Sequence, residues 1–215
     1  MTYSNKGINK ASQNMHCFIN NHILNEKHQE MVAPILINNW EATYFDFNEE
    51  KIVELATKAA ECGIELMVLD DGWFGTRNGE SGSLGDWTPN YSKLPNGIKG
   101  LAEKINDLGM KFGIWMEPEM VSPDSNLYRN HPDWCLHERN KLRSEGRSQY
   151  ILDLSREEVC DFVYNAVKNV LSSANISYLK WDMNRNMSEV GSVGFDNKRQ
   201  GEIKHRYILG LYSVL

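Results

Sequence analysis

Three short apolar segments of this chain each run directly into carboxylates that stand near tryptophans. These are residues 65–69 with Asp70 and Asp71, residues 111–116 with Glu117, and residues 176–179 with Lys180, Trp181 and Asp182. In a parallel sheet covered by helices, the strands are apolar along their length and the active site lies at their carboxyl ends. The pattern therefore predicts a parallel β/α architecture with an acidic and aromatic mouth, which favours a sugar ligand.

Helix signals separate these apolar segments. Asn48 is a favourable N-cap, and the apolar residues after it recur at helical spacing until Gly63. A second apolar helical pattern ends at Gly109. Ser155 and Glu158 have the spacing of a capping box, which predicts the start of a third helix there.

Further elements complete an alternation of strands and helices. A first strand is expected within residues 34–41, a small hairpin between residues 133–137 and 149–152, and a last helix over residues 201–215. This makes about four β/α units in series. A complete eight-stranded barrel takes about 250 residues, whereas a doubly wound sheet could be complete near this length. The last helical pattern has no Gly, Asn or Pro stop, so we expect a piece of a larger protein.

The net charge and the apolar runs of the chain argue against several classes of partner. The formal net charge is −6 and no basic block opposes it, which argues against a nucleic-acid partner or an anionic membrane surface. No apolar run approaches the roughly 18 residues that a membrane span needs. The chain is therefore expected to act on a neutral small molecule.

The cysteines and histidines point to no metal or cofactor. Cys17, Cys62, Cys135 and Cys160 form no C-x-x-C pair, so a reduced, cytoplasmic location is expected. The histidines have no zinc-binding spacing, and no glycine-rich nucleotide loop follows a predicted strand. We expect neither a metal site nor a cofactor.

Four stretches in the same order resemble the α-galactosidases of glycoside hydrolase family 36. They are Ile35 to Thr43, Leu69 to Gly75, Gly113 to Met120, and Tyr178 to Arg185. The resemblance implies a retaining hydrolase that releases terminal α-linked galactose from small substrates of the melibiose and raffinose type. It also implies a (β/α)8 barrel between an N-terminal β-sandwich and a C-terminal β domain.

The resemblance also divides the chain. Residues 1–33 resemble the connection into the barrel, and residues 34–215 then form the N-terminal half of the catalytic TIM-type barrel, truncated after about four β/α units. The fold class is thus predicted to be α/β. The parent protein is expected to be a homotetramer, an expectation that comes from the resemblance alone.

Asp182 is the predicted nucleophile. Retaining hydrolysis needs one ionised carboxylate that attacks the anomeric carbon and a second group that donates a proton to the leaving oxygen. Lys180 precedes Asp182 by two residues on a strand, so both side chains project to one face. We expect Lys180 to keep Asp182 ionised and to donate to a sugar hydroxyl. A simple ion pair at the strand end is the alternative.

The proton donor is absent by the same comparison. The resemblance implies an acid/base aspartate on a later strand, after a Cys-Ser-Gly-Gly-Gly segment that residues 1–215 do not contain. The isolated chain is therefore expected to be inactive.

Asp70, Asp71, Trp40 and Trp115 are predicted to bind the sugar. By resemblance, the two aspartates accept hydrogen bonds from galactose hydroxyls, with O4 and O6 as their partners. An Asp-Asp-Gly sequence is also common turn chemistry. The two tryptophans are expected to form apolar walls against the C–H face of the sugar. Filling a layer of the barrel interior is the alternative role for them.

The remaining candidates surround this mouth. Arg147 matches a family position that contacts the sugar or its leaving group, and Asn184 is expected to line the pocket. Glu117 and Glu119 are interpreted either as orienting residues or as ion-pair partners of barrel lysines. Residues 86–87, an aspartate and a tryptophan in the long second loop, are candidates for the rim.

Two rival functions stay open. Asp71, Glu117 and Asp182 would end successive strands as the ligands of a divalent-metal barrel enzyme do. A sugar-binding fragment without catalysis is the other. Metal content would identify the first, and galactose binding without turnover would support the second.

Overall fold

The computed structural model describes residues 3–29 and 31–215, which form two compact units. Unit 1 is Met1–Pro34 and contains helix α1 (Ile8–Phe18), a π-helical turn (Ile19–Ile23) and helix α2 (Glu26–Gln29), which together bury no side chain. Unit 2 is Ile35–Leu215 and contains the core. The division falls one residue after the predicted boundary, while the role of residues 1–33 as a connection stays a prediction.

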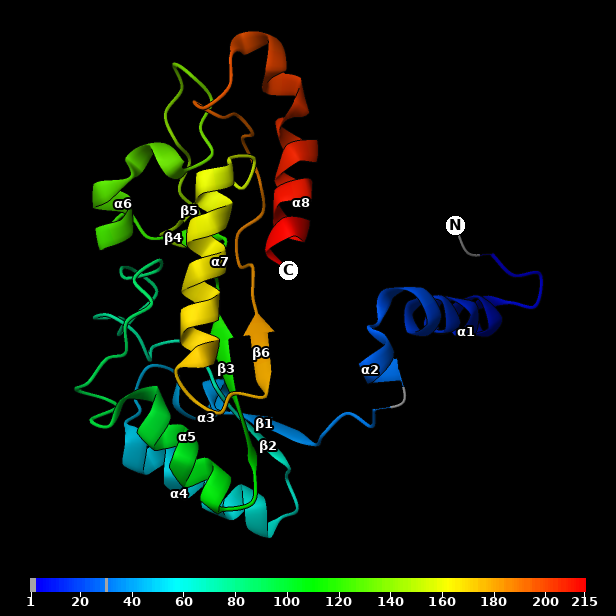
Figure 1. Cartoon of the computed structure of the whole chain (residues 1–215), viewed down its shortest axis with the longest axis vertical. Coiled ribbons are helices and arrows are strands. Elements are labelled where there is room, and N and C mark those ends of the chain that lie inside the picture. The colour runs from blue at the N-terminus through cyan, green and yellow to red at the C-terminus, as the bar shows by residue number, and fades with distance from the viewer. Residues whose placement is uncertain (1–2, 30) are drawn as a thin grey trace. The chain divides into compact units, whose positions relative to one another are not determined.

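A four-stranded parallel sheet forms the centre of unit 2 (Figure 1). Its order is β1 (Leu36–Asn38), β2 (Leu66–Leu69), β3 (Lys111–Met116) and β6 (Tyr178–Trp181). The central strands β2 and β3 are buried apart from Lys111, because helices and neighbouring strands cover them. The predicted parallel α/β fold is confirmed, and it is consistent with part of a TIM-type barrel.

The first strand is shorter than predicted. Helix α3 (Trp40–Thr43) begins where the strand was expected to continue. The side-chain oxygen of Asn38 accepts a hydrogen bond from the Trp40 backbone N–H at 2.7 Å, which turns the chain out of the sheet. The sequence pattern did not reveal this turn, because an Asn side chain that bonds to the backbone competes locally with strand pairing.

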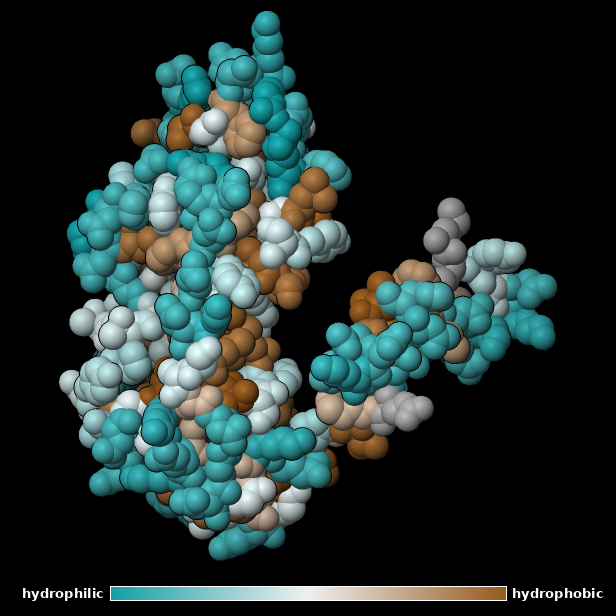
Figure 2. All heavy atoms as spheres, viewed as in Figure 1, coloured by the Kyte–Doolittle hydropathy of each residue, from teal (hydrophilic) through white to brown (hydrophobic). Residues whose placement is uncertain are grey.

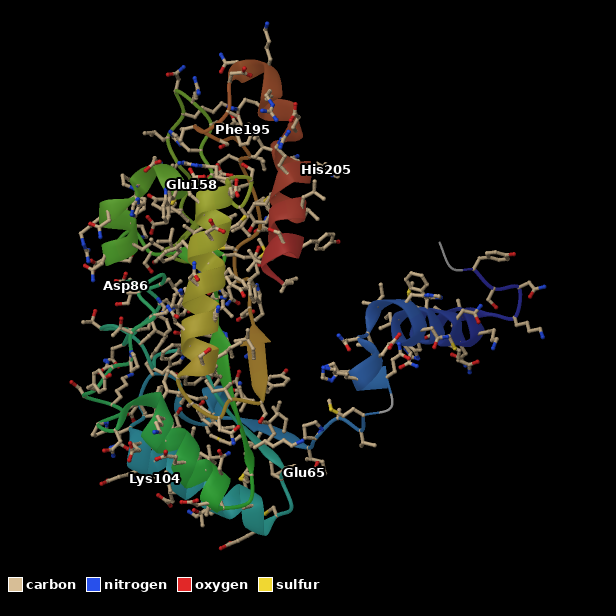
Figure 3. All side chains as sticks on the ribbon, in the orientation of Figure 1. Glu65, Asp86, Lys104, Glu158, Phe195 and His205 are labelled. Atoms are coloured by element: carbon tan, nitrogen blue, oxygen red, sulfur yellow. The ribbon has the colours of Figure 1, made fainter. Side chains whose placement is uncertain are left out.

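Helices α4 (Glu49–Glu61) and α5 (Gly97–Asp107) have the predicted ends. Asn48 caps α4 by accepting the Lys51 N–H at 2.9 Å. Gly63 and Gly109 follow the two helices at φ +81° and +80°, a left-handed conformation that favours glycine. The two helices contact each other, and Lys104, labelled in Figure 3, forms an ion pair with Glu49 across them.

The predicted capping box before the third helix is wrong. Helix α7 (Glu157–Ser172) begins later, and no side chain caps its N-terminus. The Ser155 hydroxyl instead binds the buried Asp153 carboxylate, and Glu158, at the start of α7 in Figure 3, accepts from the Arg156 guanidinium at 2.7 Å. Both groups of the expected box are therefore committed to other partners.

The two arms of the predicted hairpin pair with each other, and a further strand that was not predicted lies on the other side of the second arm. The Leu136 N–H donates to the Ile151 carbonyl at 2.9 Å. Strand β5 (Tyr150–Ile151) pairs antiparallel with β4 (Met120–Val121), and residues 133–137 contribute a single bridge between Cys135 and Leu152. A 3-10 turn at Pro132–Trp134, which follows helix α6 (Asn126–Asn130), lies at the start of the other expected arm. The turn covers only residues 133–134 of that arm, and the arm still pairs with the segment of β5.

The C-terminal helix forms as predicted after a 3-10 segment. Asn197–Glu202 leads into α8 (Ile203–Val214), which packs on α7. Gly210 permits this approach, since a Cβ there would lie 1.8 Å from the Leu154 carbonyl oxygen. Among residues 3–29 and 31–215, every helix is too short or too polar to cross a bilayer.

Candidate active site

Acidic side chains that follow three of the four strands meet at the carboxyl edge of the sheet. Asp70 follows β2, Glu117 follows β3, and Asp182 follows β6. Neighbouring parallel strands bring their carboxyl ends to one edge, as the sequence pattern predicted. A hydrogen bond between Lys180 and Asp70, which are 110 residues apart in the sequence, connects two of these strand ends directly.

Asp182 is held by three N–H donors. The Trp115 indole N–H and the Asn184 side-chain amide donate to Oδ2 at 2.9 and 2.6 Å, and the Met183 backbone N–H donates to Oδ1 at 3.0 Å. The residue is only partly buried. A carboxylate with fixed orientation and access from solvent is suited to act as a nucleophile.

Lys180 does not pair with Asp182, contrary to the prediction. Its Nζ donates to Asp70 Oδ2 at 2.7 Å, and the Asn38 amide donates to the same oxygen at 2.5 Å. The lysine side chain is long enough to cross β3 and reach the end of β2. The Asp70 side chain is only 4% exposed, so water screens this pair less than it would screen a pair with partly exposed Asp182.

Asp71 is bound by Arg77, a residue that sequence reasoning missed. Arg77 Nε donates to Asp71 Oδ1 at 2.9 Å and its Nη2 donates to Oδ2 at 2.8 Å, in a bidentate pair whose side chains are 4% and 9% exposed. Arg77 is the only basic residue between Asp71 and Lys93, a signal that could have found it. The buried Arg77 guanidinium thus uses part of the hydrogen-bond acceptor capacity of Asp71.

Glu117 and Glu119 pair with no lysine, so the ion-pair interpretation is wrong for the part of the chain that the structure describes. Glu117 accepts the Asn184 backbone N–H at 2.5 Å. Burial raises the pKa of Glu117 to about 7; the hydrogen bonds from Asn184 oppose this shift and the nearby Asp182 charge adds to it. Glu119 accepts the Trp181 indole N–H at 2.9 Å and the Tyr207 hydroxyl.

The two candidate tryptophans differ in exposure. Trp40 is partly exposed, with edge-to-face contacts to Tyr44 and Phe45 at 5.2 and 5.1 Å between ring centroids. Trp115 is 2% exposed and lies parallel to Phe74 at 6.2 Å. Trp40 can therefore offer a ring face, whereas Trp115 offers the site its N–H group.

Two outer candidates form no hydrogen bond or ion pair with Asp182 among the described residues. Arg147 is nearly half exposed and lies 3.5 Å from the Glu80 carboxylate, while the Glu80 carbonyl accepts from Arg77. Asp86, labelled in Figure 3, accepts the first backbone N–H groups of α6 at 2.8 and 3.0 Å. Its aromatic neighbour Trp87 packs against Phe74 at 4.6 Å. The 86–87 pair therefore has a structural role in this arrangement.

The acids do not form a metal-binding cluster. Within residues 3–29 and 31–215, no group of three or more His, Cys, Asp or Glu side chains is arranged to hold a metal ion. Asp71 accepts from Arg77 and Glu117 accepts from Asn184, so each of these carboxylates already has an N–H partner.

Comparison with solved structures and curated sequences finds close relatives. The chain is 59% identical to the α-galactosidase AgaA of Geobacillus stearothermophilus over its whole length, and it spans 30% of that protein. The AgaA crystal structure superposes with a TM-score of 0.95 over 99% of this chain and 30% of its own. AgaA variants have been crystallised in complex with raffinose and with stachyose.

More distant relatives agree. The chain is 46% identical to the α-galactosidase Mel36A of Lactobacillus acidophilus over 100% of its length and 29% of that protein. An α-galactosidase of Thermus thermophilus is 26% identical with a TM-score of 0.66, over 86% of this chain and 36% of its own. The Melibiase family model matches residues 1–215. The chain therefore belongs to the melibiase family, and its relatives within that family are α-galactosidases of glycoside hydrolase family 36.

Proposed function

We propose that the protein to which this chain belongs is a retaining α-galactosidase that releases terminal α-linked galactose from raffinose and melibiose. The observation that supports this most is the Asp182 carboxylate, oriented by three N–H donors at a strand end and still open to solvent. The identity with AgaA over the whole chain supports the same substrate class.

The proposed reaction has two steps. Asp182 attacks the anomeric carbon of galactose, and the glycosidic bond breaks as the leaving oxygen takes a proton from the acid/base group. Water then attacks the galactosyl ester, and the same group takes the proton from that water. By this proposal the acid/base is an aspartate outside residues 1–215, so the chain supplies the nucleophile and part of the sugar pocket.

Lys180 and Asp70 are proposed to recognise galactose hydroxyls together. A lysine ammonium has three donors, and one of them goes to Asp70. The free donors of Lys180 and the remaining acceptor capacity of Asp70 match a sugar hydroxyl that both donates and accepts, such as the axial O4 of galactose. Asp71, Asn184 and Trp40 complete the proposed pocket, with Trp115 behind the nucleophile and Arg147 at the rim.

We also propose that the chain is the first half of a (β/α)8 barrel. Strands β1 and β6 are the edges of the sheet. Exposed hydrophobic residues lie along α8 and at its end, where Figure 2 shows brown atoms on the surface; they are Ile208, Leu209 and Leu215. Tyr178 of β6 and Tyr212 of α8 are exposed as well. Barrel closure removes such edges, so later β/α units would cover them. The cytoplasmic location and the homotetramer remain expectations for the whole protein.

The decisive test uses a 2-fluorinated galactosyl donor on the complete gene product that carries this segment. The fluorine slows both formation and hydrolysis of the ester, so the donor also carries a good leaving group that keeps formation the faster step. The intermediate then accumulates, and its peptide can be mapped by mass spectrometry. We expect the label on Asp182 and no label in Asp182→Asn. A label on Glu117, Asp70 or Asp71 would overturn the assignment.

A further inference from the structure

Two buried glutamates contact the chain on either side of Asp182. Glu117 and Glu119 are 1% and 3% exposed, and both follow strand β3. Pro118 lies between them, and its fixed φ restricts the backbone that carries both glutamates. These glutamates belong to none of the predicted substrate contacts, so their burial needs another explanation.

Glu117 holds the residues that follow the nucleophile. Its Oε1 accepts the backbone N–H of Asn184 at 2.5 Å. The side chain of Asn184 turns back and donates to Asp182 Oδ2 at 2.6 Å. Glu117 thus anchors the residue that orients the attacking carboxylate.

Glu119 holds the residue that precedes the nucleophile. Its Oε1 accepts the Trp181 indole N–H at 2.9 Å, and its Oε2 accepts the hydroxyl of Tyr207 from helix α8. Tyr207 is 1% exposed, so this contact lies inside the packed core. The Asp182 backbone N–H meanwhile donates to the Met116 carbonyl at 2.9 Å, which ties the same segment to the end of β3.

Both carboxylates lie in the core without a cationic partner. Among the described residues neither glutamate forms an ion pair with lysine, arginine or histidine, and their partners are N–H and O–H groups. Burying a carboxylate without a counter-ion costs stability, and such groups are concentrated at functional sites. The position of both glutamates beside the nucleophile segment therefore makes a role in the site the explanation to test.

We propose that Glu117 and Glu119 are positioning residues that hold Asn184 and Trp181, and through them fix the Asp182 carboxylate for attack on the anomeric carbon. This inference rests on the proposed function. Neither glutamate touches the substrate or transfers a proton to it. We call Glu117 and Glu119 the clamp, because Glu119 binds Trp181, which precedes the nucleophile, and Glu117 binds Asn184, which follows it.

The clamp predicts a loss in kcat with little change in KM. Small misplacement of a reacting group can cost about 10²-fold in rate. We expect kcat for p-nitrophenyl α-galactoside to fall on the order of 10²-fold in Glu117→Ala and in Glu119→Ala, with KM unchanged within about threefold. Glu117→Gln keeps an oxygen that accepts the Asn184 N–H, so we expect it to retain most of the activity.

The matched control is Glu49→Gln, made like the others in the complete gene product. Glu49 is also a buried glutamate, at 5% exposure, but it pairs with Lys104 between α4 and α5. Its loss should lower thermal stability and leave kcat unchanged. An equal loss of kcat in Glu49→Gln, or kcat within threefold of wild type in both alanine variants, would overturn the proposal.

A second readout needs no catalysis. Hydrogen exchange of the peptide that contains residues 181–184 should be faster in both alanine variants and unchanged in Glu49→Gln. If an alanine variant does not fold, the leucine variants decide, because leucine keeps more of the side-chain volume but accepts no hydrogen bond. Faster exchange is expected in Glu117→Leu and in Glu119→Leu, and unchanged exchange in both would overturn the proposal. A wild-type protein without α-galactosidase activity refutes the proposed function instead, while the exchange data still test the clamp.

Discussion

Replacing Arg77 by Met should destabilise the protein strongly, because it leaves a buried charge alone. Arg77 makes a bidentate pair with Asp71, and both side chains are less than a tenth exposed. Its Nη1 also donates to the carbonyls of Glu80 and Gly82 at 2.8 and 3.0 Å. Removing one partner of a buried ion pair costs about 3–5 kcal/mol. Since methionine replaces much of the volume, the lost charge and donors dominate.

The measurement is the apparent melting temperature of the complete gene product at one scan rate. If the barrel domain of about 250 residues unfolds as one unit, about 1 kcal/mol corresponds to roughly 2 °C, so Arg77→Met should melt about 6–10 °C lower. Arg129→Met is the matched control, because Arg129 and its partner Asp124 are 54% and 84% exposed. Exposed pairs contribute about 0–1 kcal/mol, so that variant should melt within about 3 °C of wild type.

The stability loss in Arg77→Met should depend on pH, and the direction of this dependence tests whether the unpaired Asp71 charge causes it. Burial already raises the pKa of Asp71, and the hydrogen bonds and charge of Arg77 oppose this shift. Loss of Arg77 should therefore raise the folded-state pKa further above the unfolded value of about 4. The defect is then full above the folded pKa and shrinks as the pH falls toward 4, where both states bind the proton. The double variant Asp71→Asn with Arg77→Met should recover part of the loss at neutral pH. A shift below about 3 °C, or a defect that stays constant between pH 8 and pH 5, would refute the reasoning.

Three further outcomes are expected. Lys180→Met should lower kcat/KM for α-galactosides about 10²-fold, because Asp70 loses its 2.7 Å partner and the sugar loses a donor; values within threefold of wild type in steady-state assays would contradict this. The isolated 215-residue chain should elute as a dimer or larger species in size-exclusion chromatography and hydrolyse melibiose no faster than Asp182→Asn, whereas an active monomer would place the acid/base among these residues. Exhaustive chelation should leave the whole enzyme active, since two carboxylates suffice; activity restored by Mg²⁺ would favour the metal-dependent alternative.

Local signals determined much of the fold. The apolar runs of β2 and β3, the Asn48 cap of α4, and Gly63 and Gly109 after α4 and α5 all occur where the sequence predicts them. Each of these features depends on residues a few positions apart, so one sequence contains the whole signal. The meeting of Asp70, Glu117 and Asp182 at one edge also followed from the sequence, because parallel strands end on the same side.

The tertiary structure decided which groups pair. Lys180 reaches Asp70 rather than Asp182, Arg77 takes Asp71, and Glu117 binds the Asn184 backbone. These pairings depend on how deeply each group is buried and on which distant segments of the chain lie within the length of a side chain. Strand periodicity carries no information about either property. The capping box fails for a local reason instead, since Ser155 and Glu158 bind Asp153 and Arg156, each two residues away. The pairing of β5 with β4 is again a contact that the local sequence did not reveal. The sequence thus identified the acids of the site, and only packing assigned each acid its partner.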